Sequence, residues 1–435
     1  MDRSKLVYGE THKRMLALRN MTIRAEEVIA RCRRLATFSE DRPGLRRTFL
    51  SAPMRACHAE ISGWLKAAGA EVRVDAAGNL RGVYAGATSD GPRLLVGSHL
   101  DTVPNAGAYD GVLGVVLGVA LVEALEGRRL PFGIEVIGFS EEEGVRFGTP
   151  FIGSRALVGR VDEELLNRRD ANGISVRAAM EQFELNPGEI RRAGLRDDAL
   201  GYLEFHIEQG PVLDALRKPL GVVEAIAGQT RMVFTFFGHT NHAGTTPMDL
   251  RRDALVGAAE WIVSVERIAH DVGELVATTG HIEARPGAVN VIAGLARVTV
   301  DLRHRSDGIR DEAVAAIVAS AKEIAKRRDL SLEYQTTLDQ KAVAMDALLA
   351  GEIEAAIRSA GCEPHRMTSG AGHDAMILAE KIPAGMVFLR TPGGISHDPA
   401  ETVEVADVAK ALECGMYLLE QLAGSREIQK RIRRA

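Results

Sequence analysis

The segment Leu95–Val119, LVGSHLDTVPNAGAYDGVLGVVLGV, decides the fold class of this chain. Its first apolar run ends in His99, a loop rich in Pro, Asn and Gly leads to Asp110, and a second apolar run follows. The pattern predicts a buried strand, a loop, and a helix that begins near Asp110. In α/β proteins ligands bind at the carboxyl ends of the strands, where this segment places an imidazole and a carboxylate.

Three further apolar runs lead to side chains of the same chemical types. Ile134–Phe139 precedes three consecutive glutamates, the run before Gly210 carries His206, and His397 follows the run Gly385–Leu389 and a glycine-rich turn. Histidine and carboxylate ligands suit zinc, manganese or cobalt better than magnesium. The sequence therefore predicts a divalent-metal site at these strand ends, in which one carboxylate bridges two ions. Its candidate ligands are His99, Asp110, Glu143, His206 and His397.

Several of these residues also have simpler explanations. Asp110 alone would serve as the N-cap of the following helix, and the glutamates alone would form a solvated acidic turn. Charge placed directly after a buried strand is unfavourable, however, unless a cation shares it. Asp101, two residues after His99, would share the face of that imidazole and fix its tautomer.

The composition is that of an ordinary globular protein. The 435 residues carry a formal net charge of −5 and a pI near 6.2, which give no electrostatic reason to expect nucleic acid or an acidic membrane surface as a partner. The four cysteines are scattered, so a disulfide framework is not expected. The polar N-terminus lacks the apolar core of a signal peptide, and no apolar run approaches the roughly 20 residues that span a bilayer. A cytoplasmic location is expected.

The sequence pattern changes after about residue 221. A strand–helix–strand–strand–helix–strand order follows, in which Met232–Gly238 and Val289–Arg303 are predicted strands. This order indicates a compact α+β insert, and the final part of the chain returns to the first pattern. We therefore predict an α/β fold with a mixed central sheet flanked by helices, plus an inserted α+β domain. The predicted segments are 1–221 and 340–435 for the catalytic domain and 222–339 for the insert.

The motifs together resemble a known family. GSHLDTVPNAGAYDGVLG, EEGVRF, FHIEQGPVL, HTNHAGTTPM and GISHDPAE are similar to motifs of the amidase family that includes N-carbamoyl-L-amino acid hydrolases, β-ureidopropionase and allantoate amidohydrolase. This family belongs to the dinuclear aminoacylase- and carboxypeptidase-like metallohydrolases. The resemblance implies two divalent ions bridged by Asp110, either zinc or manganese, with cobalt or nickel also compatible. It implies that Glu142 is the general base and Glu143 the ligand, because the motif EEG-x-RF aligns in this register.

The same resemblance gives the insert a role. In the family this region is a lid and a dimer interface, so a homodimer is expected. His242 matches the histidine that polarises the scissile carbonyl, and Asn290 and Arg303 match the pair that binds the substrate carboxylate. For His239, a position on the lid surface is an equally good interpretation.

Three residues outside the insert complete the predicted site. Gln209 and Gly394 are expected to line the substrate pocket, and Asp101 to support catalysis beside His99. Arg390 lies close to the site in the sequence, where it would either add a second anion contact or face solvent.

The expected activity is hydrolysis of a linear C–N amide bond. The expected partner is a small molecule, an N-carbamoyl amino acid or a related ureido carboxylate such as allantoate, and carbamoyl substrates would release ammonia and carbon dioxide. The nearest alternative is an aminoacylase or dipeptidase of the same superfamily, against which the histidine in FHIEQG argues. A non-catalytic binding protein would not need the base, the ligands and the lid histidine together. A nicotinamide enzyme would need a GxGxxG fingerprint, which Gly111, Gly114 and Gly118 do not form.

Overall fold

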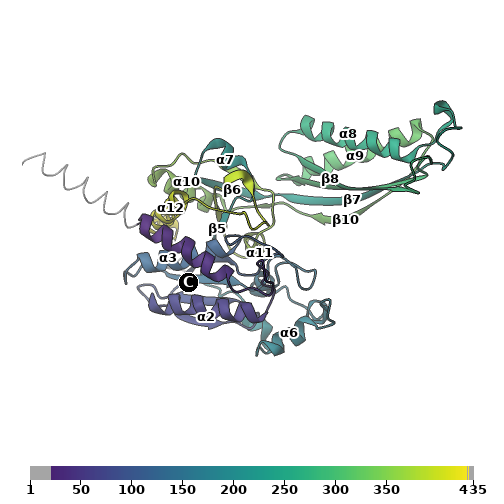
Figure 1. The fold of residues 1–435 in the computed structure, drawn as a ribbon. Helices are drawn as coiled ribbons and strands as arrows, with labels where there is room; N and C mark the ends of the chain where they lie inside the picture. Colours follow the sequence, from purple (N-terminus) through teal and green to yellow (C-terminus); the bar gives the residue numbers. More distant parts are fainter. Residues whose placement is uncertain (1–20, 429, 431–435) are drawn as a thin grey trace, which may run out of the picture. The chain divides into compact units, whose positions relative to one another are not determined.

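The computed structural model describes residues 21–428 and residue 430, and it divides into two compact units (Figure 1). The first unit contains the chain up to Glu224 and from Met345 onward, and the second contains Ala225–Ala344. The insert begins later than the predicted 222 because β6 (Leu220–Ile226) still belongs to the first sheet. It ends later than the predicted 339 because β10 (Ser331–Gln340) continues past that residue, before β11 (Val343–Ala344) returns the chain to β6. The expectation about a signal peptide concerns residues 1–20, which lie outside this description. Among the described helices, none is long and apolar enough to cross a membrane.

The first unit is built on a nine-stranded mixed sheet, which confirms the predicted fold class. Strands β4, β3, β5 and β13 lie side by side and run parallel, and the outer strands pair antiparallel. The strand order is β1 (Glu71–Val74), β2 (Leu80–Tyr84), β4 (Gly133–Phe139), β3 (Arg93–His99), β5 (Ala199–Ile207), β13 (Ala384–Leu389), β6 and β11, with β12 (Arg366–Ser369) also paired to β6.

Helices cover both faces of this sheet, as the continuous apolar runs of its parallel strands require. Leu203 and Phe205 of β5 belong to the large hydrophobic core beside α3 (Val112–Ala124), in which 11 of 13 residues are buried. Glu204, between them, accepts a hydrogen bond from the Ala375 amide in α11 (Asp374–Leu378). Because successive side chains of a strand point to opposite faces, α11 and α3 lie on opposite sides of the sheet.

The remaining elements of the first unit complete these layers. Helix α3 contacts α2 (Ala52–Ala67) and α12 (Val405–Gly424), and α12 contacts α10 (Ala347–Ser359), so these four helices form one continuous layer. The bounds are α2 (Ala52–Ala67), α4 (Ile152–Leu157), α5 (Glu163–Asn167), α6 (Val176–Gln182), η1 (Pro187–Ala193), α7 (Val212–Leu216), α10 (Ala347–Ser359), η3 (Pro392–Gly394) and α12 (Val405–Gly424), and residues 21–36 are helical.

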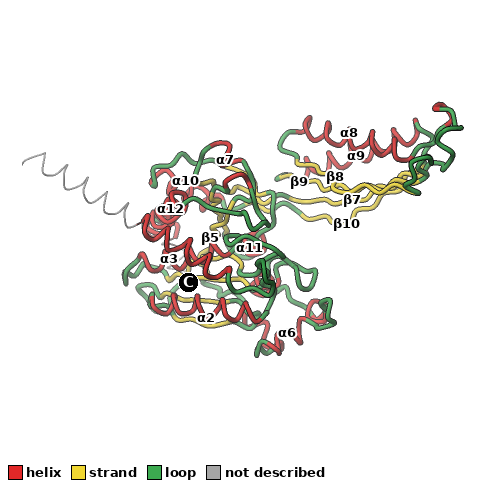
Figure 2. Tube along the Cα trace, in the orientation of Figure 1, coloured by secondary structure: helices red, strands yellow, loops and turns green. Residues whose placement is uncertain are grey.

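The second unit is a four-stranded antiparallel sheet with two helices (Figure 2). Trp261 of α8 (Ala254–Val272) is fully buried and packs on Phe234 of β7 (Gly228–Phe237), and the two rings form the centre of the core of this unit. The strand predicted over Val289–Arg303 begins only at Leu295, because residues 286–294 form a loop. The elements are β7 (Gly228–Phe237), η2 (Met248–Leu250), α8 (Ala254–Val272), β8 (Val276–Arg285), β9 (Leu295–His304), α9 (Asp307–Arg327) and β10 (Ser331–Gln340), with strand order β10-β7-β9-β8.

His58 of α2 makes the stability of the first unit sensitive to acid. Neither ring nitrogen has a hydrogen-bond partner within the described part of the chain, and burial, followed by the charges of Arg47 and Arg55, lowers the pKa of His58 to about 3. Because the unfolded chain titrates at about 6.5, it binds one more proton than the folded chain between these two pH values. We therefore expect His58 to cost about 2 kcal/mol of unfolding free energy at pH 5 relative to neutral pH.

The measurement is urea unfolding of the wild type and of His58→Leu at pH 7 and pH 5. The loss of unfolding free energy between these pH values is expected to be about 2 kcal/mol smaller in the variant. An equal loss in both proteins would contradict the assignment of a neutral, buried His58.

Candidate metal centre

The parallel strands of the first unit bring the five predicted metal ligands to one edge of the sheet. His99 is the last residue of β3 and pairs in register with Phe139, the last residue of β4, directly before the glutamates. His206 lies near the end of β5, in register with Phe388 of β13. The carboxyl ends of parallel strands meet at the same edge, so residues far apart in the sequence become neighbours.

Asp110 lies at the centre of this group. Its Oδ1 is 3.2 Å from His206 Nε2 and 3.7 Å from His99 Nε2. Its Oδ2 is 3.2 Å from His397 Nε2, which in turn is 3.8 Å from Glu143 Oε1. The donor atoms therefore form two sets that share Asp110, one with His99 and His206 and the other with Glu143 and His397.

The hydrogen bonds of the two buried imidazoles fit a bound cation. Nδ1 of His99 lies 3.0 Å from the carbonyl oxygen of Asp101, and Nδ1 of His206 lies 2.9 Å from that of Ile207, so each Nδ1 carries the proton. In the neutral rings both Nε2 atoms then present lone pairs, 3.4 Å from each other and beside the carboxylate of Asp110. Oδ1 of Asp110 is buried and has no hydrogen-bond partner among the described residues. A cation between electron-pair donors that face one another in this way would stabilise them.

The pKa shifts of the ligands also favour a bound cation. Burial opposes a charge on His99, but the carboxylates of Asp101 and Asp110 outweigh it and raise its pKa. Burial and the neighbouring charge of Asp110 raise the pKa of Glu143 to about 7. The surroundings thus favour positive charge at the imidazoles and disfavour uncompensated negative charge at Glu143, and a divalent cation satisfies both.

Asp110 is not the cap of the helix that follows it. The N-cap of α3 is Gly111, which makes no side-chain capping hydrogen bond. Gly111 has a φ of 65°, and a Cβ atom there would lie 2.4 Å from the His99 ring. The turn at Gly111 therefore requires glycine. This turn directs the carboxylate of Asp110 towards His99 and His206.

Asp101 fixes the segment that carries the glutamates. Its Oδ1 accepts a hydrogen bond of 2.9 Å from the amide of Glu142, and its Oδ2 accepts one of 3.0 Å from the amide of Glu143. The carboxylate of Glu141 turns back to accept the Gly144 amide at 2.6 Å. Donor atoms of Glu142 and Glu143 lie together with His99, and burial raises the pKa of Glu142 well above its usual range.

The pocket residues predicted in this unit lie beside the metal ligands. Gln209, with a φ of 59°, donates from Nε2 to Oδ2 of Asp110 at 3.0 Å. Gly394 adopts a φ of 67°, and a Cβ atom there would lie 2.8 Å from the backbone nitrogen of Pro211. Arg390 makes two hydrogen bonds with Asp407, of 2.7 and 3.2 Å, which favours a structural role over a second anion contact.

The structure adds a buried histidine that the motif analysis did not assign. The His373 ring lies 4.4 Å from that of His206, and its Nε2 is 2.9 Å from Ser369 Oγ. Burial holds its pKa well below the usual range. In the sequence, only its position in SGAGHDAM, directly before α11, could have pointed to His373. A single histidine in a glycine-containing loop does not by itself indicate a place beside metal ligands.

In the second unit, the predicted residues His242 and Asn290 lie on adjacent loops. Val291 pairs with His242 in an isolated bridge, and the Ala243 amide donates to the Asn290 carbonyl oxygen at 3.0 Å. The Gly244 amide donates to Nδ1 of His242 at 3.1 Å, so the proton of the neutral ring is on Nε2. The exposed edge of His242 therefore presents a hydrogen-bond donor.

Arg303 lies at the other end of β9. Its Nε and Nη2 donate to the carboxylate of Asp301 at 2.9 and 3.1 Å, which orients the guanidinium. The strand from Leu295 to Arg303 spans roughly 26 Å at 3.3 Å per residue. Because Asn290 and the His242 loop meet at the Leu295 end of β9, roughly the length of this strand separates them from Arg303 within the unit.

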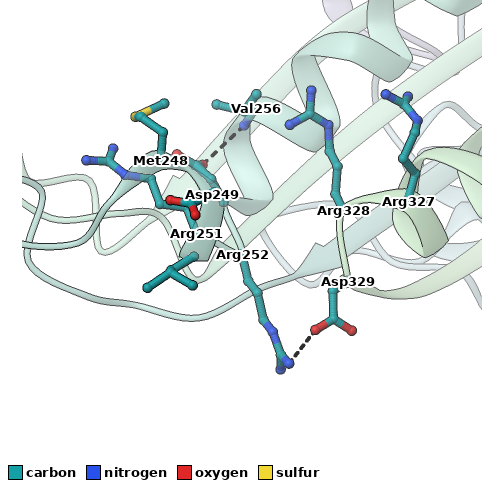
Figure 3. A pocket seen from close by; sticks show the side chains of 10 residues that line it. Met248, Asp249, Arg251, Arg252, Val256, Arg327, Arg328 and Asp329 are labelled. Carbon is teal, nitrogen blue, oxygen red and sulfur yellow. Dashed lines mark hydrogen bonds and ion pairs between the residues drawn. The ribbon is translucent and has the colours of Figure 1, made fainter.

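The second unit also has a pocket of about 450 Å³ formed by the loop before α8 and the end of α9 (Figure 3). Arg252 and Asp329 form an ion pair across it, and Arg327 and Arg328 pair with Glu260. None of the predicted site residues lines this pocket. Arg252, Arg327 and Arg328 thus serve ion pairs within the unit, and Arg251 donates to the carbonyl oxygens of Thr246 and Ala243.

Comparison with known proteins decides the family. The model of peptidase family M20/M25/M40 matches residues 95–421. N-carbamoyl-L-amino acid amidohydrolase of Geobacillus stearothermophilus is 39% identical over 87% of this chain and 94% of its own, and allantoate deiminase of Arabidopsis thaliana is 38% identical over 95% and 85%. A hydantoinase/carbamoylase family amidase from Burkholderia multivorans superposes with a TM-score of 0.86 at 32% identity, over 91% of this chain and 97% of that structure.

The chain belongs to the M20/M25/M40 family. Within it, the relatives confirm the predicted hydantoinase/carbamoylase type of amidase. Members of the M20/M25/M40 family are metal-dependent hydrolases, so this chain is a metal-dependent enzyme that acts on amide bonds. The clustered His, Asp and Glu side chains around Asp110 are the residues that could hold its metal.

Proposed function

We propose that the protein hydrolyses the linear C–N bond of a ureido group in an N-carbamoyl amino acid or a related ureido carboxylate such as allantoate. The observation that carries the proposal is the pair of donor sets that share Asp110, next to the buried carboxylate of Glu142. The ureido class of substrate is supported by the similarity to an N-carbamoyl-L-amino acid amidohydrolase and to an allantoate deiminase. Neither relative supports the aminoacylase alternative.

His99, Asp110 and His206 would hold one divalent ion, and Asp110, Glu143 and His397 a second, with zinc or manganese suited to these donors and cobalt or nickel also compatible. Ions bound there would acidify a water molecule and withdraw electrons from the substrate carbonyl. Gln209, which donates to Oδ2 of Asp110, holds in place the carboxylate that the two ions would share.

The chain's own residues carry the proton transfers. Glu142 accepts a proton from the attacking water, and its raised pKa suits it to deliver that proton to the leaving nitrogen. Nε2–H of His242 donates a hydrogen bond to the oxyanion that develops on the carbonyl oxygen. Asn290 and Arg303 bind the substrate carboxylate, and Asp101 keeps Glu142 and Glu143 in place through their amides. For a carbamoyl substrate the products are ammonia, carbon dioxide and the free amino acid.

The test compares N-carbamoyl and N-acetyl derivatives of the same L-amino acids, together with allantoate, using protein reconstituted with zinc or manganese. We expect metal-dependent ammonia release from at least one ureido compound, and at least about tenfold slower release of free amino acid from the acetyl derivatives. Faster cleavage of the acetyl derivatives would replace the proposal with an aminoacylase.

We further propose that the enzyme is a homodimer in which two subunits share each active site. The length of β9, roughly 26 Å, separates His242 and Asn290 from Arg303, which is too far for one small substrate to contact all three in one copy. Strand β8 is an edge of the second sheet and exposes Val276 and Ile282, while α8 exposes Val263. An open edge strand beside exposed apolar side chains suits pairing with a second copy.

Complementation between two inactive variants tests this arrangement. Glu142→Gln and His242→Ala are each expected to be inactive, but a mixture refolded together should recover about a quarter of the wild-type activity. The reason is that half of the dimers are mixed, and in each of these one site receives both intact residues. A mixture as inactive as its components would show that His242 acts within its own subunit.

A further inference from the structure

Glu401 connects the two loops that carry Asp110 and His397. Its Oε1 accepts hydrogen bonds from the amides of Tyr109 and Asp110, at 2.9 and 3.1 Å, and its Oε2 lies 3.3 Å from the hydroxyl of Ser396. The side chain is 5% exposed. Almost 300 residues separate the two loops in the sequence, and this carboxylate joins them inside the first unit.

Gly107 shows how closely the first of these loops packs on Glu401. A Cβ atom at Gly107 would lie 2.4 Å from both Cβ and Oε1 of Glu401. Any larger residue would therefore push the carboxylate away from the Tyr109 and Asp110 amides. The position of Glu401 thus depends on its close packing against Gly107 as well as on its hydrogen bonds.

The two donor sets around Asp110 differ in how firmly the fold holds them. His99 and His206 lie on adjacent parallel strands and are 2% and 1% exposed. The His397 side chain is 50% exposed, and this residue has a φ of 57° in a loop after η3. The set that contains His397 therefore relies on loop contacts, and the link from Glu401 through Ser396 is one of them.

We propose that Glu401 is a positioning residue that holds Asp110 in register with His397 and so selectively supports the ion site of Asp110, Glu143 and His397. The proposal rests on the proposed function only in taking these donor sets as metal sites. Glu401 is not a ligand, because its oxygens are engaged by backbone amides and a hydroxyl. Residues that orient metal ligands in this way typically change metal affinity 10- to 100-fold when they are removed.

The experiment is a calorimetric titration of the metal-free, full-length protein with zinc alone. We expect two binding steps in the wild type. In Glu401→Ala one step should weaken at least about tenfold while the other stays within about twofold. Gly107→Ala should weaken the same step although it leaves the charge of Glu401 intact. Glu401→Gln should keep near wild-type affinity, because its amide oxygen can accept the Tyr109 and Asp110 amides.

The control is Glu404→Ala, an exposed glutamate three residues further along, which should bind zinc as the wild type does. Wild-type affinities in both Glu401→Ala and Gly107→Ala, or an equal loss of both steps in a folded variant, would overturn the proposal. So would a Glu401→Gln variant as weak as the alanine variant, since charge rather than positioning would then matter. A wild type that binds two zinc ions without releasing ammonia from ureido compounds would contradict the proposed function and leave this inference standing.

Discussion

Replacing Glu142 with glutamine is expected to lower kcat by a factor of about 10² to 10⁴, the range found when a general base is removed. Glutamine has nearly the same shape, and the backbone amide that Asp101 accepts is unchanged. It cannot, however, take a proton from water at neutral pH. The measurement is steady-state ammonia release, combined with metal analysis of the same sample. Metal content should equal that of the wild type, because the two donor sets around Asp110 do not require Glu142.

The neighbouring Glu141 provides the matched control. Its carboxylate accepts the Gly144 amide, and a glutamine oxygen can accept the same bond, so Glu141→Gln should retain activity to within about tenfold. If Glu141→Gln were inactive and Glu142→Gln active, the assignment of the general base within the three glutamates would be wrong by one residue.

Replacing Asp110 with alanine is expected to have the second large effect, on metal content. The shared carboxylate belongs to both donor sets, so its loss leaves two ligands on each side. Two protein ligands are fewer than the three that catalytic zinc sites normally keep. We expect Asp110→Ala to lose both ions on dialysis and to release no ammonia, as measured by elemental analysis and the activity assay.

His397→Ala is the informative comparison for this prediction. It removes a ligand from only one set, so it should retain one ion held by His99, Asp110 and His206. An Asp110→Ala protein that still carries two ions after dialysis would show that Asp110 does not bridge the two sites.

The strands around the site could be predicted well from the sequence, and with them the convergence of the ligands. The apolar runs that become β3 and β4 are continuous because both faces of the sheet are covered. Polar residues that follow such parallel strands meet at one edge of the sheet. The positions of the apolar runs were therefore enough to predict that His99, Asp110 and Glu143 lie close together.

Residues that act through buried hydrogen bonds could not be predicted in this way. Glu401 and His373 lie in polar, glycine-containing loops, which in a sequence look the same as solvated turns. Only the folded chain shows that Glu401 is 5% exposed and bonded to the amides before α3. Their roles depend on contacts between segments distant in the sequence, which neither periodicity nor spacing encodes.

In the second unit, the spacing of two residues in the sequence did not predict their distance in the fold. Asn290 and Arg303 are 13 residues apart and match one motif, yet a strand of ten residues places them at opposite ends of the sheet. The sequence pattern predicted the order of strands and helices. It could not give the loop at 286–294, because the apolar residues Val289, Val291 and Ile292 are typical of a strand.

The most direct test of the central claim is ammonia release as a function of zinc added to the metal-free protein, with allantoate and several N-carbamoyl-L-amino acids as substrates. If two ion sites share Asp110 next to Glu142, we expect ammonia release from a ureido substrate to rise with added zinc. The rate should reach a plateau at about two equivalents of zinc per chain. Binding of two equivalents without ammonia release from any of these substrates would contradict the account, as would full activity at one equivalent.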